Sequence, residues 1–296
     1  MVLSKIFGQP DERTLEQFDC CASMASRASL SADSHVGYSQ PIGAAIGYSR
    51  MISPSGVGYD IGCGNKAVKT DWTIDDAVNA GPSAIADTLV NHISFGVGKK
   101  NKEHVDHIVF ESIEKSPVKE QRDMIHLAAE QLGTVGSGNH YVDLFYDEDG
   151  WVWVGVHFGS RGFGHKTATG FLALAAGKQW GDKVHDSMDA PPVLLKQSDP
   201  LGQDYFTAMS IAGEYAYAGR DWVCDKVLDI LGANMVDGVH NHHNFAWLEE
   251  HFGEELTVIR KGCTPAWPGQ RGFVGGAMGD VSVILAGVDS PASADA

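Results

Sequence analysis

Hydrophobic and polar positions recur at fixed spacings along the 296-residue chain, and these spacings predict its secondary structure. Apolar residues at helical spacing predict helices over 11–28, 73–93, 118–132 and 210–232. Runs of β-branched and aromatic residues predict strands over 64–70, 140–146, 151–158, 255–260 and 281–286. Helices and strands mix without a regular βαβ succession. We therefore expect an α+β layered fold in which helices flank mixed or antiparallel β-sheets.

Composition and charge narrow the class of protein. The chain is 43% hydrophobic and 20% charged, as in ordinary globular proteins, and no apolar run approaches the roughly 18 residues of a membrane span. With no repeat or linker, we expect a single domain over 1–296 and, by default, a cytoplasmic location. The formal charge of −16 argues against a broad nucleic-acid-binding face but allows a small basic site. Of the five cysteines, we expect Cys20, Cys21 and Cys224 to be small buried hydrophobes.

Two strand-like runs flank an acidic Asp-Glu-Asp-Gly turn and predict a β-hairpin within 133–162. If Glu148 and Asp149 form a two-residue loop, facing residues have numbers that sum to 297, so His140 lies opposite His157. Shifting this loop by one residue leaves both histidines on one face of the hairpin. A three-residue loop would place them out of register, and they would no longer share a face. Two imidazoles on an apolar face need partners. These are either backbone hydrogen bonds or a shared metal ion, and we favour the metal.

A glycine-rich stretch, VGYDIGCG, holds Asp60 and Cys63 three residues apart. Glycines allow the backbone to turn so that both side chains face one centre, although a plain structural turn is the alternative. Carboxylate, thiolate and imidazole together suit a transition metal rather than calcium or magnesium. A third source of ligands is VHNHHNFAW, where His240, His242 and His243 crowd together. Not all three can point inward, a solvated cluster is the alternative, and the spacing selects none of them.

Cationic residues beside these segments are candidates for binding phosphate. Arg161 lies between glycines in FGSRGFGHK, where the backbone can approach a phosphate closely while the guanidinium binds it. Arg260 and Lys261 lie at the end of a predicted strand. Ion pairs on a solvated surface are the alternative for all three.

Taken together, six segments resemble the RtcB family of RNA ligases, which join 2′,3′-cyclic-phosphate or 3′-phosphate ends to 5′-hydroxyl ends. They follow the family's order through nearly the whole chain: DSHVGYSQPIG (33–43), GVGYDIGCG (56–64), GTVGSGNHYVDL (133–144), VHFGSRGFGH (156–165), NHHNF (241–245) and RKGCTPAWPGQRGFVGGAMGDVS (260–282).

The resemblance implies a ligase that uses two manganese ions and GTP and acts on RNA, with no membrane partner and with a helper protein left open. The metal ligands that it implies are Asp60, Cys63, His140, His157 and His243. It implies further that Asn139 contacts the guanylate phosphate and that Asp143 and Ser282 lie near the guanine. Arg161 and Lys261 would hold phosphates of RNA or nucleotide, and Asp33 would support the catalytic histidine.

The sequence departs from the family pattern in several places, including the following two. The family usually has glutamate at the position of Asp143, which is one methylene shorter. In the family a histidine of an HGAGR-like motif accepts GMP from GTP, but no such motif occurs within 1–296 and no histidine follows His251. We therefore expect a chain that is C-terminally incomplete relative to the family, with ligase activity impaired or lost. The alternatives are a dinuclear metal-dependent phosphoesterase and a non-catalytic metal- or RNA-binding module.

Overall fold

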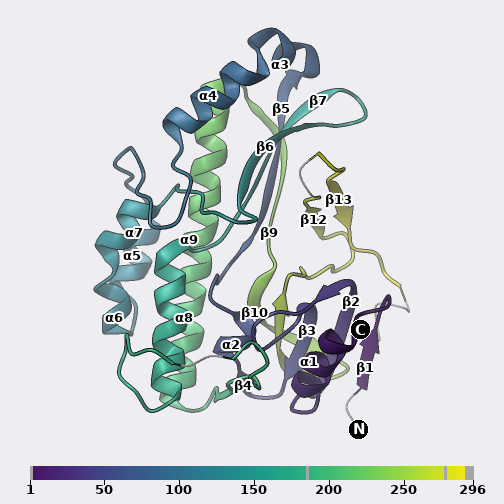
Figure 1. Ribbon diagram of the computed structural model, residues 1–296, viewed down its shortest axis with the longest axis vertical. Helices are drawn as coiled ribbons and strands as arrows, with labels where there is room; N and C mark the ends of the chain where they lie inside the picture. The colour runs from purple at the N-terminus through teal and green to yellow at the C-terminus, as the bar shows by residue number, and fades with distance from the viewer. Residues whose placement is uncertain (1–2, 185–186, 277–278, 291–296) are drawn as a thin grey trace.

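The computed structural model describes residues 3–184, 187–276 and 279–290, and its elements confirm the α+β class (Figure 1). The helices are α1 (Glu12–Ala22), α2 (Pro54–Val57), α3 (Ile74–Ala80), α4 (Pro82–His92), α5 (Val109–Glu114), α6 (Lys119–Arg122), α7 (Ile125–Gln131), α8 (Arg161–Ala175) and α9 (Pro200–Leu231). The strands are β1 (Leu3–Ile6), β2 (Arg27–His35), β3 (Ile42–Tyr48), β4 (Met51–Ile52), β5 (Gly64–Thr73), β6 (Tyr141–Tyr146), β7 (Trp151–Phe158), β8 (Leu195–Lys196), β9 (Met235–His242), β10 (Asn244–His251), β11 (Glu254–Lys261), β12 (Arg271–Val274) and β13 (Val283–Ala286).

A four-stranded antiparallel sheet in the order β6-β7-β5-β9 carries the residues of interest. The long helix α9 runs behind this sheet with α8 beside it (Figure 1). Strand β5 is central, and its residue Asn65 faces His157 of β7 on one side and Asn241 of β9 on the other. Val68, Val154 and Val156 are fully buried in the core of this sheet. The centre of the sheet is thus a rigid frame for side chains at its edge.

A second, five-stranded sheet has the order β1-β2-β3-β11-β10. Its β1–β2 pair is parallel and its other pairs are antiparallel, which confirms the mixed sheet that the sequence predicts. Helix α1 packs on β2 and β3, and Phe18 and Cys21 of α1 are fully buried. Strand β10 follows β9 after one residue, so this sheet and the four-stranded sheet are joined close to His243.

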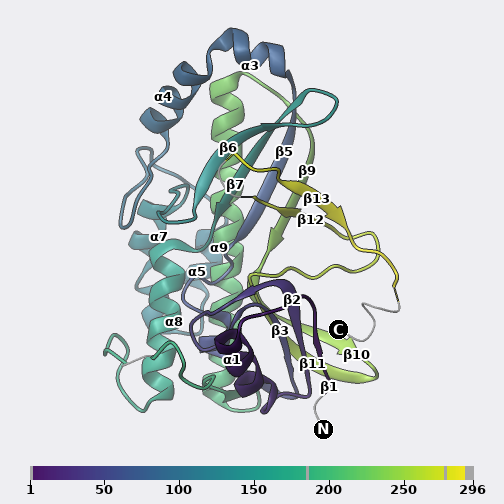
Figure 2. The ribbon, with the colours of Figure 1, turned by 45° about the vertical axis from the view of Figure 1, so that its right-hand side comes forward.

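A small hairpin, β12–β13, covers the face of the four-stranded sheet that α9 leaves open (Figure 2). Two asparagines of the sheet hold it there. Asn65 Nδ2 donates to Phe273 O at 2.9 Å, and Phe273 N donates to Asn241 Oδ1 at 3.0 Å. The ring of Phe273 is buried between the two layers.

The strand prediction 151–158 matches β7 at both ends, and 64–70, 140–146, 255–260 and 281–286 each overlap a strand. The helix prediction 11–28 is wrong beyond Ala22, because the chain there enters β2, where Ala28 and Leu30 are buried in the sheet. The predicted helix 73–93 is divided at Gly81, whose φ of 84° interrupts helical geometry. The predicted helix 118–132 is likewise two short helices, α6 and α7.

Within the described part of the chain, no helix has both the length and the apolar composition that a membrane crossing requires. All five cysteines are free. Cys21 and Cys224 are fully buried, as predicted, whereas Cys20 is only half-buried because it lies on the outer side of α1.

Candidate metal centre

Cys63 lies at the end of a tight turn that leads into the central strand β5. Cys63 N donates to the carbonyl of Asp60 at 3.1 Å, and Gly62 has a φ of 69°, a conformation that glycine adopts without strain. A Cβ atom on Gly62 would lie within 3.1 Å of Gly213 in α9. The turn therefore needs glycine for both its conformation and its packing. It brings Asp60 and Cys63 to the same side of the chain, as their spacing predicts.

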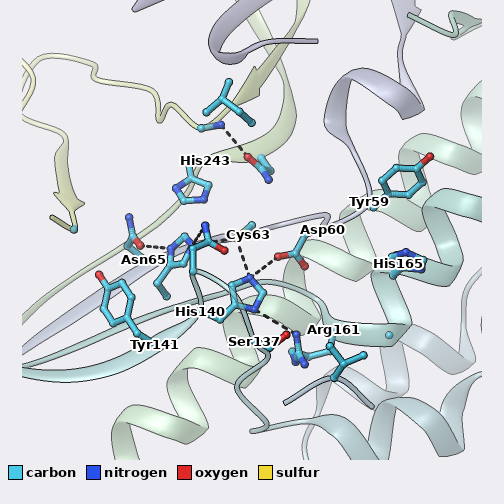
Figure 3. A pocket seen from close by; sticks show the side chains of 18 of the residues that line it. Tyr59, Asp60, Cys63, Asn65, Ser137, His140, Tyr141, Arg161, His165 and His243 are labelled. Carbon is cyan, nitrogen blue, oxygen red and sulfur yellow. Dashed lines mark hydrogen bonds and ion pairs between the residues drawn. The ribbon is translucent and has the colours of Figure 1, made fainter. Parts of the chain in front are cut away.

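Two histidines, His140 and His157, converge on this turn, and Figure 3 shows His140 beside Cys63. The Sγ atom of Cys63 lies 3.7 Å from His140 Nε2 and 3.6 Å from His157 Nε2. These three donor atoms all lie within 4.8 Å of one another, which is close enough for one ion to contact them together. Asp60 Oδ2 lies 3.0 Å from His140 Nε2, so a carboxylate oxygen borders the same group. We call Cys63, His140 and His157 the donor triad.

The hairpin register that we predicted for the two histidines is wrong. Facing residues have numbers that sum to 298, because Asp147 N pairs with Trp151 O and encloses a three-residue loop. His157 therefore faces Tyr141, whose ring stacks on the imidazole at 5.6 Å between centroids. His140 comes before the first residue of β6 and does not follow the alternation of the strand. It reaches Cys63 from the preceding loop.

A hydrogen-bonded asparagine fixes the orientation of His157. Asn65 Oδ1 lies 2.6 Å from His157 Nδ1, while Asn65 Nδ2 donates to the carbonyl of Phe273. The amide oxygen can only accept, so the proton of the imidazole resides on Nδ1 and the lone pair of Nε2 points toward Cys63. This is the arrangement that a histidine ligand of a metal ion usually has.

The crowded histidines of VHNHHNFAW separate into two groups. His240 and His242 share one face of β9 and contact Arg220 of α9, at 2.8 Å from Nε and 3.0 Å from Nη2 respectively. His243 follows the end of β9, its backbone N–H donates to Cys63 O at 2.8 Å, and its ring centroid lies 5.0 Å from that of His157. His243 alone of the three borders the donor triad.

Burial shifts the pKa values of Cys63, His157 and His243. It raises the pKa of Cys63 well above its ordinary value, and the charge of Asp60 adds to this. Burial lowers the pKa of His157 to about 2 and that of His243 to about 4, with neighbouring cationic groups as the second cause. Burial alone would raise the pKa of Asp60, but the hydrogen bond from His140 outweighs it and the pKa is lowered. At neutral pH the imidazoles of His157 and His243 are therefore neutral and able to bind a cation.

These residues line a pocket of about 1000 Å³. Of the residues that the sequence singles out, the lining includes Asp33, Asp60, Cys63, Asn139, His140, His157, Arg161 and His243. Arg161 Nη1 lies 3.5 Å from His140 Nδ1, and Asn139 Nδ2 lies 3.4 Å from His157 Nε2. The pocket thus combines the candidate ligands with the guanidinium of Arg161 and the amide of Asn139.

Four predicted site residues do not line this pocket. Arg260 forms an ion pair with Glu249, with Nη1 2.7 Å from Oε1. Lys261 is buried and donates to the carbonyl of Tyr38 at 2.6 Å. Asp143 accepts from the N–H of Leu144, and burial raises its pKa. Ser282 accepts from the N–H of Gly276, which is itself a lining residue.

Sequence reasoning missed several residues that shape the site. Asn65 lies two positions after Cys63, so the alternation of a strand could have placed it beside the donor triad. Tyr59 and His165 also line the pocket, and neither stood out because their relation is one of distant segments meeting in space. Arg220 lies within a helix that reads from its sequence as a packing element.

Comparison with known proteins agrees with the six motifs. Residues 15–295 match the family model described as tRNA-splicing ligase RtcB. The chain is 32% identical to the tRNA-splicing ligase RtcB of Pyrobaculum aerophilum, covering 86% of this chain and 68% of the relative. It is 31% identical to the protein of that name from Thermococcus kodakarensis (94% and 73%) and 29% identical to the RNA-splicing ligase RtcB of Escherichia coli (88% and 70%). The chain therefore belongs to the RtcB family.

Proposed function

We propose that this protein is an RNA ligase that depends on GTP and manganese and joins 2′,3′-cyclic-phosphate or 3′-phosphate ends to 5′-hydroxyl ends, in the cytoplasm. The observation that carries the proposal is the convergence of the Cys63 thiol with the His140 and His157 imidazoles in a pocket of about 1000 Å³. Membership of the RtcB family makes RNA ligation the chemistry that fits this convergence best.

The donor set supports a divalent transition metal. A thiol, at least two imidazoles and a carboxylate are the donors that such ions accept, and calcium and magnesium prefer oxygen alone. Asn65 orients His157 for this role. In our proposal Asp60, Cys63, His140, His157 and His243 hold two ions, and manganese is the metal that the family resemblance implies. The raised pKa of Cys63 means that its proton must leave when a metal binds.

Bound metal ions would neutralise charge that develops on the phosphates and would orient them. Side chains of the protein would bind the phosphates and the guanine. Arg161 and Asn139 face the same pocket and would bind phosphate oxygens through N–H groups. Lys261, which is buried and bonded to the carbonyl of Tyr38, would attract phosphate through its positive charge. Asp143 and Ser282 would contact guanine, and Asp33 would support the guanylate-accepting histidine. RNA is the partner in this scheme.

The step that takes GMP from GTP needs a nucleophile. Because HGAGR does not occur within 1–296, we expect these residues on their own to form no covalent GMP adduct. Incubation with radiolabelled GTP and manganese measures this. A labelled protein band that survives denaturation would show that another residue accepts GMP.

RNA that already carries GMP on its 3′-phosphate tests the ligase function without that step. The 5′-hydroxyl of a second RNA then displaces GMP and forms the phosphodiester. We expect residues 1–296 with manganese to join the two RNAs, His157→Ala to abolish joining, and His251→Ala, outside the pocket, to leave it unchanged. Hydrolysis of a 2′,3′-cyclic phosphate without joining would indicate a phosphoesterase instead. RNA bound without turnover would indicate a binding module.

A further inference from the structure

An aromatic pair lines the pocket on the side away from Tyr141. The rings of Tyr59 and His165 stack with centroids 5.4 Å apart and planes 28° apart, and both residues line the pocket. Tyr38 meets Tyr59 edge-on, with centroids 6.1 Å apart. We call Tyr59 and His165 the aromatic shelf. Figure 3 shows the shelf on one side of Cys63, and Tyr141 and Asn65 on the other.

The shelf is held close to the candidate ligands by the chain itself. Tyr59 directly precedes Asp60, so the stacked ring and the carboxylate leave adjacent backbone positions. His165 lies one helical turn after Arg161 on α8, and Arg161 contacts His140. A group bound at the donor triad would therefore have the shelf as its neighbour.

The exposure of the shelf indicates a ligand rather than a packing role. Tyr59 is partly buried against the core, but His165 and its neighbour Lys166 are exposed and line the same pocket. The exposed imidazole of His165, stacked on Tyr59, therefore borders the pocket beside the positive charge of Lys166. Aromatic faces and cations together are what single-stranded nucleic acids bind, through stacked bases and phosphates.

We propose that the aromatic shelf binds the nucleobase of the RNA nucleotide that carries the reactive 3′-phosphate. This inference rests on the proposed function. The base belongs to RNA rather than to the guanine of GTP, because the residues proposed for guanylate (Asn139, Asp143 and Ser282) belong to β6, the loop before it, and the loop before β13. Asn139 and Asp143 lie two residues before and after Tyr141, and Ser282 bonds to Gly276, whose neighbour Gly275 lies against the Tyr141 hydroxyl. Figure 3 shows Tyr141 on the opposite side of Cys63 from the shelf. Any base can stack on an aromatic ring, so we expect the shelf not to distinguish one base from another.

A terminal abasic site separates base stacking from phosphate binding. The probes are a fluorescent oligoribonucleotide with a 3′-phosphate and the same RNA whose terminal residue lacks its base, and anisotropy gives Kd for each in manganese. We expect the wild type to bind the probe with its base about 5- to 150-fold more tightly, the range for stacking one base on an aromatic side chain. His165→Ala and Tyr59→Leu should lose this preference and bind the abasic probe like the wild type. Tyr59→Phe should keep it.

Each result decides one statement. If the variants keep the wild-type preference for the base, the shelf is not a base-binding site, and the proposed function stands. If the wild type distinguishes the probes by less than twofold, the same conclusion follows. If the wild type binds neither RNA, the proposed function fails and the shelf with it. Manganese titration of His165→Ala, expected to match the wild type, shows that the metal site is intact.

Discussion

Two clusters of histidines lie near the central strand β5, and they differ in how their nitrogen atoms are satisfied. In the cluster toward α9, Arg220 donates to His240 and His242 and also to the carbonyls of Gly62 and Phe158. In the donor triad, nitrogen and sulfur atoms face one another at 3.6–3.7 Å. In the first cluster, hydrogen bonds within the protein satisfy the buried polar groups. The second brings a thiol, two imidazoles and a neighbouring carboxylate to a common point, and these are groups that bind a transition-metal ion.

The largest effect is expected from breaking the first cluster. Arg220→Met removes four hydrogen bonds from a fully buried side chain and leaves two carbonyls and two imidazoles without their donor. We expect a loss of about 3–5 kcal/mol in the free energy of unfolding. Urea unfolding without metal measures it. Arg13→Met, which breaks an exposed ion pair with Asp189, is the control and should cost less than about 1 kcal/mol.

A smaller effect is expected from loosening the second cluster through Asn65. Asn65→Ala removes the acceptor of His157 Nδ1, so the ring no longer has a fixed orientation. We expect manganese affinity to fall about 10- to 100-fold. Asn241→Ala is the matched control, because Asn241 holds the same Phe273 but no histidine. If both variants weaken manganese binding equally, the effect comes from the β12–β13 hairpin and not from His157.

The backbone near Asp60 gives a third and milder test. A Cβ atom on Gly159 would lie 2.3 Å from Asp60 Oδ1, so Gly159→Ala must displace this carboxylate. We expect about tenfold weaker manganese binding, equivalent to about 1.4 kcal/mol, with the fold retained. Gly272→Ala is the control, because its new Cβ would meet only a methyl group of Thr264, at 3.3 Å, and we expect it to bind manganese like the wild type. Unchanged metal affinity in Gly159→Ala would show that Asp60 is not a ligand.

The smallest effect concerns pH and the first cluster. Burial lowers the pKa of His240 to about 4, although Asp221 lies 3.2 Å from its Nδ1. The unfolded chain has a histidine pKa near 6.5, so between pH 6.5 and 4 the unfolded state binds more protons and stability falls as pH falls. We expect His240 to contribute about 1 kcal/mol of this loss between pH 7 and 5.5. Unfolding of His240→Asn in EDTA should show a correspondingly flatter profile, and an identical profile would contradict a neutral His240.

The sequence predicted the turn and the strand that form the site better than it predicted the contacts between them. The turn at Asp60 and Cys63 follows from its glycines, and β7 follows from its run of β-branched and aromatic residues, since both depend on neighbouring residues. The pairing of His140 with His157 was expected from the wrong register, because one extra loop residue moves every partner by one position. The two histidines meet nonetheless, because His140 lies in a loop that the strand register does not govern.

Residue spacing alone does not predict contacts between distant segments of the chain. His240, His242 and His243 are equivalent in the sequence, and it is Arg220, arriving on α9, that separates them. Only the family resemblance singled out His243. In the same way, Tyr59 and His165 are 106 positions apart and meet only because α8 packs beside the turn. Helix 11–28 was predicted too long because burial of Ala28 and Leu30 in a sheet outweighs their helical spacing.

Manganese titration of two cysteine variants tests the donor triad most directly. Cys63 and Cys224 are both free and buried, but only Cys63 faces the imidazoles. Electron paramagnetic resonance of free manganese gives the affinity, and thermal melting confirms that each variant is folded. We predict that Cys63→Ala weakens binding by more than about 100-fold, while Cys224→Ala binds like the wild type. Wild-type affinity in Cys63→Ala would contradict a metal centre at this site.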